Sequence, residues 1–378
     1  MEDRKNARAS PGCLAQSDEL NQIVSSFPDG VEHAVGYGSG VFAQTALAVP
    51  QSNEGSTDEE AIEEVESKEP PMIDLLLSVN DSRSFHTSNL RIFPDHYSSL
   101  CRLLGPSQVT AIQRSDWGAR IYFNPLVDSP AGGRKIKYGV IQTEDLIEDL
   151  TEWRWLYAAG RMHKPTASLE GYIDERVLEA QEVNLDMALS ASLLLLSGDC
   201  GATAHNLGDA NPGDMGDPYS SFGLSKVFEI ISGISYAGDP RMDVGGEDPD
   251  KVAKLVRSPG QMARFWDLYR PHLLRMEQAG LITVGMSGNT RAHKGYIEFN
   301  PSDSAFQTEL LGHLPKRLRT RSSSDAQTSM KLCRMMSDIV RPAARYQSFK
   351  GLLTAGIVRS ARYASAKFAK GALRGSFQ

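Results

Sequence analysis

A glycine turn between two apolar strands is the feature of this sequence that most constrains its fold. Residues 33–37, "HAVGY", show the pattern of a strand and run directly into Gly38, Ser39 and Gly40, with Ser39 at the start of a predicted helix. A strand, a glycine turn and a helix in this order can hold a phosphate, because the glycines allow a close approach and the N–H groups at the start of the helix point at the anion. A plain tight turn is the alternative interpretation.

The second strand, "MIDLLLSV" at 72–79, carries one acid, Asp74, in an otherwise apolar run. An unpaired carboxylate buried there would cost several kcal/mol, so Asp74 requires a partner, either a metal cation or a basic side chain. In nucleotidyltransferases of the polymerase-β type, a second acid stands two positions further along this strand, on the same face. Here that position is Leu76, and Asp81 and Asp239 are the candidates for a second carboxylate.

The remaining pattern predicts an α/β half followed by a mainly helical half. We expect a loose tail up to residue 20, a helix at 17–27, and a polar turn after the strand at 72–79. Further expected elements are a helical piece near 95–104, strands at 119–124 and 135–141, helices at 143–159, 176–197, 222–236, 249–257 and 260–279, and a hairpin at 281–299.

Two segments have the composition of loops. Residues 51–70 contain eight acids and one Lys, and residues 198–217 are rich in Gly and Asp. The four cysteines lie far apart and show no zinc-ligand or disulfide spacing.

The end of the chain differs in charge from the rest. Residues 331–378 contain ten Lys and Arg against one acid, which leaves 30 basic and 46 acidic residues elsewhere. Apolar side chains alternate with these cations, which favours an amphipathic helix at an anionic membrane surface. A partner-binding or nucleic-acid-binding arm is the alternative.

Other polar residues are candidates for the same chemistry. Lys137 in the strand "IKYGVI" could neutralise phosphate charge. Asp239 and Arg241 in "ISYAGDPRM" could bind a metal and a phosphate, or could simply stabilise a turn. We interpret Arg161 and Lys164 as cations at a helix C-terminus, and a group of residues including His86 and His96 as hydrogen-bonded structural side chains.

The sequence resembles one family over nearly its whole length, the mitochondrial phosphatidate cytidylyltransferases, also known as translocator assembly and maintenance proteins. The resemblance rests on several segments in order, which are "GYGSGVFAQ", "MIDLLLSVNDSRSFHTSNL", "PDHYSSL", "KYGVIQTEDLIEDLTEWRWLYAAGRMHKP", "ISYAGDPRM", "GEDPDKV" and "IVRPAARYQSFKGLLTAG". It implies a nucleotidyltransferase-like domain at 21–174, a helical, winged-helix-like domain at 175–315, and a basic membrane-binding tail at 316–378.

The resemblance also implies an activity, the Mg²⁺-dependent synthesis of CDP-diacylglycerol and pyrophosphate from CTP and phosphatidate. In that interpretation Gly38, Ser39, Gly40 and Lys137 bind the nucleotide, Asp74 binds the metal, Asp239 assists catalysis and Arg241 binds phosphatidate.

The implied location is peripheral, on the matrix side of the mitochondrial inner membrane, although residues 1–12 do not form a convincing presequence. Two alternatives stay open. One is a nucleotidyltransferase with a soluble or RNA acceptor, although no nucleic acid is expected, and the other is a non-enzymatic assembly factor for protein import.

Overall fold

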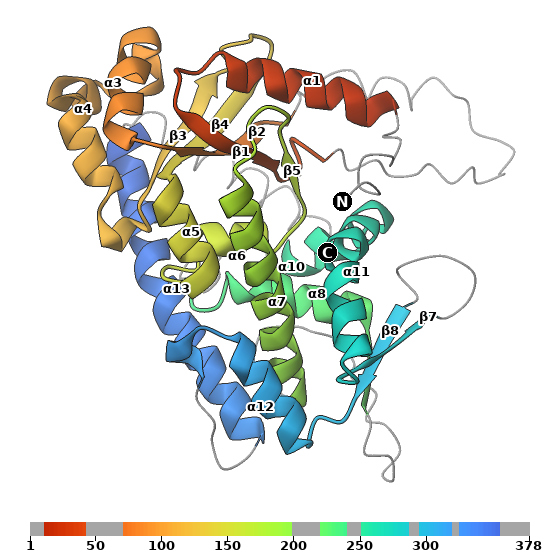
Figure 1. Ribbon diagram of the computed structural model, residues 1–378. Coiled ribbons are helices and arrows are strands. Elements are labelled where there is room, and N and C mark those ends of the chain that lie inside the picture. Colours follow the sequence, from red (N-terminus) through yellow and green to blue (C-terminus); the bar gives the residue numbers. More distant parts are fainter. Residues whose placement is uncertain are drawn as a thin grey trace, which may run out of the picture.

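The computed structural model describes residues 11–42, 71–198, 220–239, 251–286, 295–319 and 325–355 (Figure 1). Its larger sheet has five strands in the order β3-β4-β2-β1-β5. These strands are β1 (Val31–Tyr37), β2 (Ile73–Val79), β3 (Ile121–Asp128), β4 (Lys135–Gln142) and β5 (Thr166–Ser168). The pair β2·β4 is parallel and the other pairs are antiparallel, so the sheet is mixed, as the expected α/β and α+β character requires.

The sheet is covered on both faces, which explains why β2 reads as a near-continuous apolar run. Ile73, Leu75 and Leu77 pack in one apolar cluster with α1 (Pro11–Ser25), while Leu76 belongs to the cluster on the other face. Helix α1 begins at Pro11, earlier than the loose tail predicted up to residue 20, and proline is well suited to a first helical turn.

Three helices cover the second face: α5 (Thr143–Glu152), α6 (Ala158–Met162) and α7 (Glu175–Ser197). Figure 1 shows α1 on one side of the sheet and α5, α6 and α7 on the other. The predicted helix at 143–159 is therefore wrong in its extent. It ends at Glu152 because Trp153 adopts a left-handed conformation (φ 50°), which stops the helical hydrogen bonds.

The predicted polar turn after β2 is also wrong, because a helix, α3 (Ser82–Ile92), lies there. The Asp81 side chain caps it by accepting a hydrogen bond from the Ser84 N–H at 2.6 Å. A 3-10 turn, η2 (Pro94–His96), leads to α4 (Ser99–Gln113), which is kinked at Gly105. A second such turn, η3 (Asp116–Gly118), leads into β3.

The second part contains a three-stranded antiparallel sheet in the order β6-β8-β7 with helices beside it, consistent with a winged-helix-like arrangement. The expected hairpin is confirmed as β7 (Thr283–Met286) and β8 (Gly295–Phe299), and β6 is Ser220–Gly223. The helices are α8 (Leu224–Ile234), α10 (Lys251–Arg257), α11 (Pro259–Gln278) and α12 (Ser304–His313).

The chain from residue 316 begins with η6 (Lys316–Leu318) and continues as a long helix, α13 (Asp325–Ala355). Leu332, Met336 and Val340 of α13 are buried in the main apolar cluster, so this part of the predicted tail packs against the body of the protein. Residues 356–378 lie outside the described ranges. No helix among the described residues is both long and apolar enough to span a bilayer.

Candidate functional site

Three strands of the larger sheet place polar side chains in one row. Tyr37 at the end of β1 lies opposite Asp74 near the start of β2, and Asp74 lies opposite Lys137 of β4. Directly paired residues project from the same face of a sheet, so these three side chains are neighbours. The row lies on the face that α5, α6 and α7 cover, at the end of β1 where the glycine turn begins.

The partner of Asp74 in this structure is Lys137. Their Oδ1 and Nζ atoms are 2.9 Å apart, and the side chains are 22% and 20% exposed. The pair therefore satisfies the carboxylate that the sequence placed in an apolar strand, while both groups stay within reach of a ligand. When a nucleotide binds, a partly exposed lysine in such a pair can exchange its carboxylate partner for a phosphate group. The carboxylate can then exchange the lysine for a metal ion.

The glycine turn lies next to the carboxylate of Asp74. Gly38 has a φ of 80°, and a Cβ atom built on it would lie 3.5 Å from Oδ2 of Asp74. Gly40 lies in a more crowded place, because a Cβ atom built on it would lie 2.0 Å from the carbonyl oxygen of Met72, directly before β2. Ser39 is exposed at the tip. The turn is hydrogen-bonded from Phe42 N–H to the Gly38 carbonyl at 3.0 Å. The predicted helix start at Ser39 is wrong, because residues 39–42 form a turn, and residues 43–70 lie outside the described part of the chain.

One further cation, Arg161, and two aromatic rings extend the row. Lys137 Nζ lies 5.2 Å from the centre of the Phe123 ring, and the Arg161 guanidinium lies 5.5 Å from the same ring and 4.0 Å from that of Tyr157. Gly139 makes room for Phe123, because a Cβ there would approach its ring to 2.7 Å. The aromatic faces hold both cations by cation–π attraction beside Asp74.

Arg161 also donates a hydrogen bond from Nη1 to the Tyr157 carbonyl at 2.7 Å, as expected for a cation near a helix end. Burial lowers its pKa, but the adjacent phenol groups of Tyr157 and Tyr37 outweigh this and the net direction is upward. Burial raises the pKa of the Tyr37 phenol, although Lys137 opposes the shift. Arg161 thus stays cationic and Tyr37 stays neutral, and the site keeps a positive charge beside the Asp74–Lys137 pair.

The connection between α5 and α6 is held by one buried carboxylate, Asp149. Its Oδ1 accepts hydrogen bonds from the N–H groups of Trp155 and Leu156, at 2.8 and 2.7 Å. Its Oδ2 accepts three more, at 2.8 to 3.1 Å, from Tyr157, Ala158 and Ala159. The five bonds fix the backbone that carries Tyr157 and leads to Arg161.

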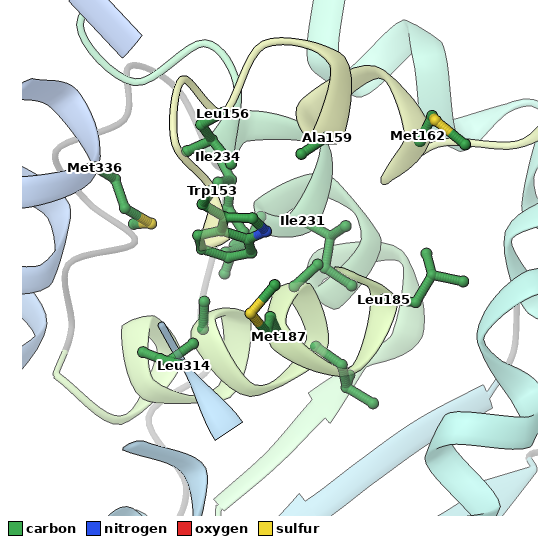
Figure 2. Close-up of a cluster of buried hydrophobic side chains, with 14 of the residues drawn as sticks. Trp153, Leu156, Ala159, Met162, Leu185, Met187, Ile231, Ile234, Leu314 and Met336 are labelled. Atoms are coloured by element: carbon green, nitrogen blue, oxygen red, sulfur yellow. The ribbon is translucent and has the colours of Figure 1, made fainter. Parts of the chain in front are cut away.

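Apolar packing secures the same connection. Figure 2 shows Trp153, Leu156 and Ala159 lying among Ile231 and Ile234 of α8, Met187 of α7 and Met336 of α13. Trp153 is fully buried and donates its indole N–H to the Asn184 side chain at 2.8 Å.

Two of the other predicted site residues, Asp239 and Asp81, lie in the described part of the chain, and neither belongs to this row. Asp239 is buried, 2% exposed, in the turn after α8. Ser235 of that turn accepts a hydrogen bond from Lys164 at 2.9 Å, so the turn adjoins the end of α6. The role of Asp239 in catalysis stays a prediction, and Arg241 lies outside the described residues. Asp81 caps α3 at the far end of β2, about 20 Å from Asp74 by strand rise, and therefore cannot share its ligand.

The site has an oxygen donor suited to Mg²⁺, which prefers carboxylate, phosphate and water oxygens. Asp74 is partly exposed next to the turn that would hold phosphate, so this carboxylate is the residue that would hold such an ion. In the part of the chain that the structure describes, no group of three or more His, Cys, Asp and Glu side chains is placed to hold a metal ion.

The histidines noted in the sequence belong to a buried polar network on the opposite face. His86 is bonded to the Tyr97 hydroxyl at 2.8 Å and to the Gln113 side chain at 2.6 Å. His96 is bonded to the Tyr138 hydroxyl at 3.0 Å. Tyr138 neighbours Lys137 in β4, and successive strand residues point to opposite faces. The structural interpretation of these histidines is therefore supported.

Sequence reasoning missed Tyr37, Phe123, Tyr157 and Asp149. The glycine in "IKYGVI" was a usable signal, since a glycine inside a strand often marks the close approach of another group. Asp149 gave no signal, because its partners are backbone groups of a non-helical connection that the sequence pattern assigned to a helix.

The fold and the row of side chains define a nucleotidyltransferase-like protein. The family model described as "Phosphatidate cytidylyltransferase, mitochondrial" matches residues 20–207 and 218–370. Curated relatives of that name include proteins from Xenopus laevis, 33% identical over 93% of this chain and 94% of theirs, and Drosophila melanogaster, 34% identical over 93% and 98%. A third, from Caenorhabditis elegans, is 32% identical over 93% and 98%. The chain belongs to the mitochondrial phosphatidate cytidylyltransferase family.

Proposed function

We propose that this protein is a phosphatidate cytidylyltransferase, which forms CDP-diacylglycerol and pyrophosphate from CTP and phosphatidate. Family membership over nearly the whole chain supports the substrates and favours this activity over an assembly factor or a soluble or RNA acceptor. The observation in the structure that carries the proposal is the position of the glycine turn next to Asp74, which is itself paired with Lys137.

In the proposed complex, the backbone N–H groups at Gly38–Gly40 bind the triphosphate and the Ser39 hydroxyl donates to it. Lys137 leaves Asp74 and pairs with a phosphate oxygen, and Arg161, which lies over the same Phe123 ring, adds a second positive charge. Asp74 is then available to hold Mg²⁺. The bound ion would neutralise charge on the phosphates, and the proposed roles of Asp239 and Arg241 are to assist there and to hold the phosphate of phosphatidate.

The reaction needs no strong base. An anionic oxygen of the phosphatidate phosphate attacks the α-phosphorus of CTP, a new P–O bond forms, and the bond to pyrophosphate breaks with its electrons going to the leaving oxygen. Catalysis can therefore come from positioning and from charge neutralisation by Lys137 and Arg161.

The names of the relatives support a mitochondrial location, and we place the enzyme on the matrix side of the inner membrane, supplying cardiolipin synthesis. The basic residues after α13 support attachment to an anionic membrane surface.

The test is an assay of purified protein with labelled CTP, Mg²⁺ and phosphatidate vesicles, comparing wild type with Asp74→Asn. Asp128→Asn is the matched control, because Asp128 pairs with Lys135 at 2.5 Å but is 86% exposed at the β3–β4 turn. We expect product from wild type and the control, and a loss of at least about 100-fold in kcat for Asp74→Asn. Full activity of a folded Asp74→Asn variant would contradict the assignment of the site.

A further inference from the structure

Helix α4 exposes a stripe of leucines. Leu100, Leu103 and Leu104 are 47%, 85% and 43% exposed, and their spacing puts them on one face of the helix. Ile92 at the end of α3 and Trp117 of η3, 54% and 70% exposed, add large apolar side chains in adjoining elements. Large exposed apolar groups gathered in one region mark an interaction surface.

The charge of this region differs from that of the whole chain. Residues 81–120 contain five Arg and three Asp and no Lys or Glu, a net charge of +2, whereas the chain as a whole is at −7. Arg83 and Arg91 on α3, Arg102 on α4 and Arg114 at the end of α4 are exposed, and Arg102 pairs with Asp95 at 3.1 Å. Arginines beside exposed leucines and a tryptophan match the chemistry of an anionic lipid surface, with apolar groups entering the headgroup boundary and cations at the phosphates.

The same region adjoins the point where the basic end of the chain begins. Helix α13 contacts both α4 and η3, and Gln347 donates hydrogen bonds to the carbonyls of Gly118 and Ile121, the latter at 3.0 Å. Figure 1 shows α13 running along the side of the molecule that carries α4. The 23 residues from 356 to 378 follow directly and contain five Lys and Arg and no acid.

We propose that the exposed face of α4, with Ile92 and Trp117, is a second membrane-docking surface that binds an anionic bilayer together with residues 356–378. Two attachments at different places on the molecule fix the orientation of the enzyme on the membrane, which a single attachment does not. Occupation of the stripe by residues 356–378 themselves is less favourable, because it would bring five cations against the arginines.

The test uses Leu100→Glu/Leu103→Glu in the full chain, with Leu274→Glu as the control. Leu274 is also an exposed helical leucine, 36% exposed on α11, in a different part of the molecule. Circular dichroism and thermal unfolding confirm that each variant is folded. Binding is measured by flotation with phosphatidylcholine vesicles, with and without phosphatidylglycerol.

We expect the double variant to bind the anionic vesicles at least about tenfold more weakly, equivalent to about 1.4 kcal/mol, and the control to stay within about twofold of wild type. If the double variant misfolds, Arg91→Gln tests the cationic part of the surface, and weaker binding at low salt is the expected result. Unchanged vesicle binding by either folded variant would overturn the proposal. Stronger binding after deletion of 356–378 would also overturn it, because that segment would then be covering the stripe.

An activity measurement separates docking from chemistry, and only this part rests on the proposed function. The double variant should lose turnover of phosphatidate embedded in vesicles but keep wild-type turnover of monomeric short-chain phosphatidate. Loss of both in a folded variant would overturn a pure docking role. If wild type turns over neither substrate, the proposed function fails, while the flotation result still decides the docking surface. A dimer that dissociates in the double variant without any change in vesicle binding would assign the stripe to a second copy of the chain.

Discussion

Replacing Asp149 by asparagine tests how the α5–α6 connection is held. The two carboxylate oxygens of Asp149 accept five backbone hydrogen bonds, two on Oδ1 and three on Oδ2, and the residue is 1% exposed. An asparagine has one oxygen, so at best it keeps the three bonds of Oδ2. Its NH₂ group then faces the N–H groups of Trp155 and Leu156, which become buried donors without an acceptor.

The magnitude follows from those two lost bonds. Each unsatisfied buried N–H group costs about 1–3 kcal/mol, so Asp149→Asn should lower the free energy of unfolding by about 2–6 kcal/mol. Arg317 gives a second reason to expect a large loss of stability. It donates hydrogen bonds to the carbonyls of Trp153 and Glu152, at 3.0 Å for the latter. Burial lowers the pKa of Arg317, and the negative charge of Asp149 partly offsets this shift.

Urea unfolding followed by circular dichroism measures this change. Glu148→Gln on the same helix is the matched control, because Glu148 is 41% exposed and its nearest cation is 4.0 Å away, so its effect should stay within about 0.5 kcal/mol. A loss below about 1 kcal/mol for Asp149→Asn would refute the claim that the carboxylate holds the connection. At a temperature where the variant is still folded, its nucleotide KM should rise, because Tyr157 and Arg161 are no longer fixed beside Phe123.

Two further predictions concern the turn and the buried histidines. Gly40→Ala should abolish activity and destabilise the protein, because the added Cβ would lie 2.0 Å from the Met72 carbonyl oxygen. The control is Gly312→Ala in α12, where the added Cβ meets nothing within 4 Å and should stabilise the protein by about 0.5–1 kcal/mol. Equal free energies of unfolding for the two variants would contradict this prediction. Burial lowers the pKa of His33 from 6.5 to about 4 and the pKa of His163 from 6.5 to about 3. Between these values the unfolded chain binds protons that the native protein does not, so the free energy of unfolding should fall as pH falls from about 6.5 to about 4. Each histidine contributes a slope of up to about 1.4 kcal/mol per pH unit, and His163→Gln should remove one of the two slopes measured by urea unfolding at several pH values; an unchanged slope would show that His163 does not titrate in this way.

Local patterns predicted the parts of the fold that depend on nearest neighbours. The apolar run of β2 and the glycine turn were found because a doubly covered strand and a strand-to-turn junction have clear local signals. Helix α3 was missed because "DSRSFHTSNL" has few apolar residues. Its buried side chains include His86 and Asn89, whose hydrogen-bond partners include Gln113 and Tyr138, 27 and 49 positions away. The break after Glu152 was missed because it depends on the Asp149 side chain folding back onto residues up to ten positions later.

For the candidate site, the sequence predicted single residues but not how they pair in space. Asp74 and Lys137 were identified separately, but their ion pair follows from the parallel register of β2 and β4, which two segments 63 residues apart do not reveal locally. Arg161 lies near a helix end, as is common for a cation, and its contact with Tyr157 is local, but only the tertiary structure brings it over the ring of Phe123.

The departure from the usual pair of strand acids has a structural reason. Leu76, two positions beyond Asp74, is 2% exposed and packs with Val35 in the cluster that joins the sheet to the helices covering it. An acid at that position would be a buried charge beneath α5, α6 and α7, whereas the row of Tyr37, Asp74 and Lys137 lies where that cover ends and Asp74 remains 22% exposed. The helical layer therefore limits the sheet to one exposed carboxylate in this strand. Further oxygen ligands for a metal ion would therefore come from outside the strand, where water, the phosphates of the nucleotide and the proposed Asp239 carboxylate can supply them.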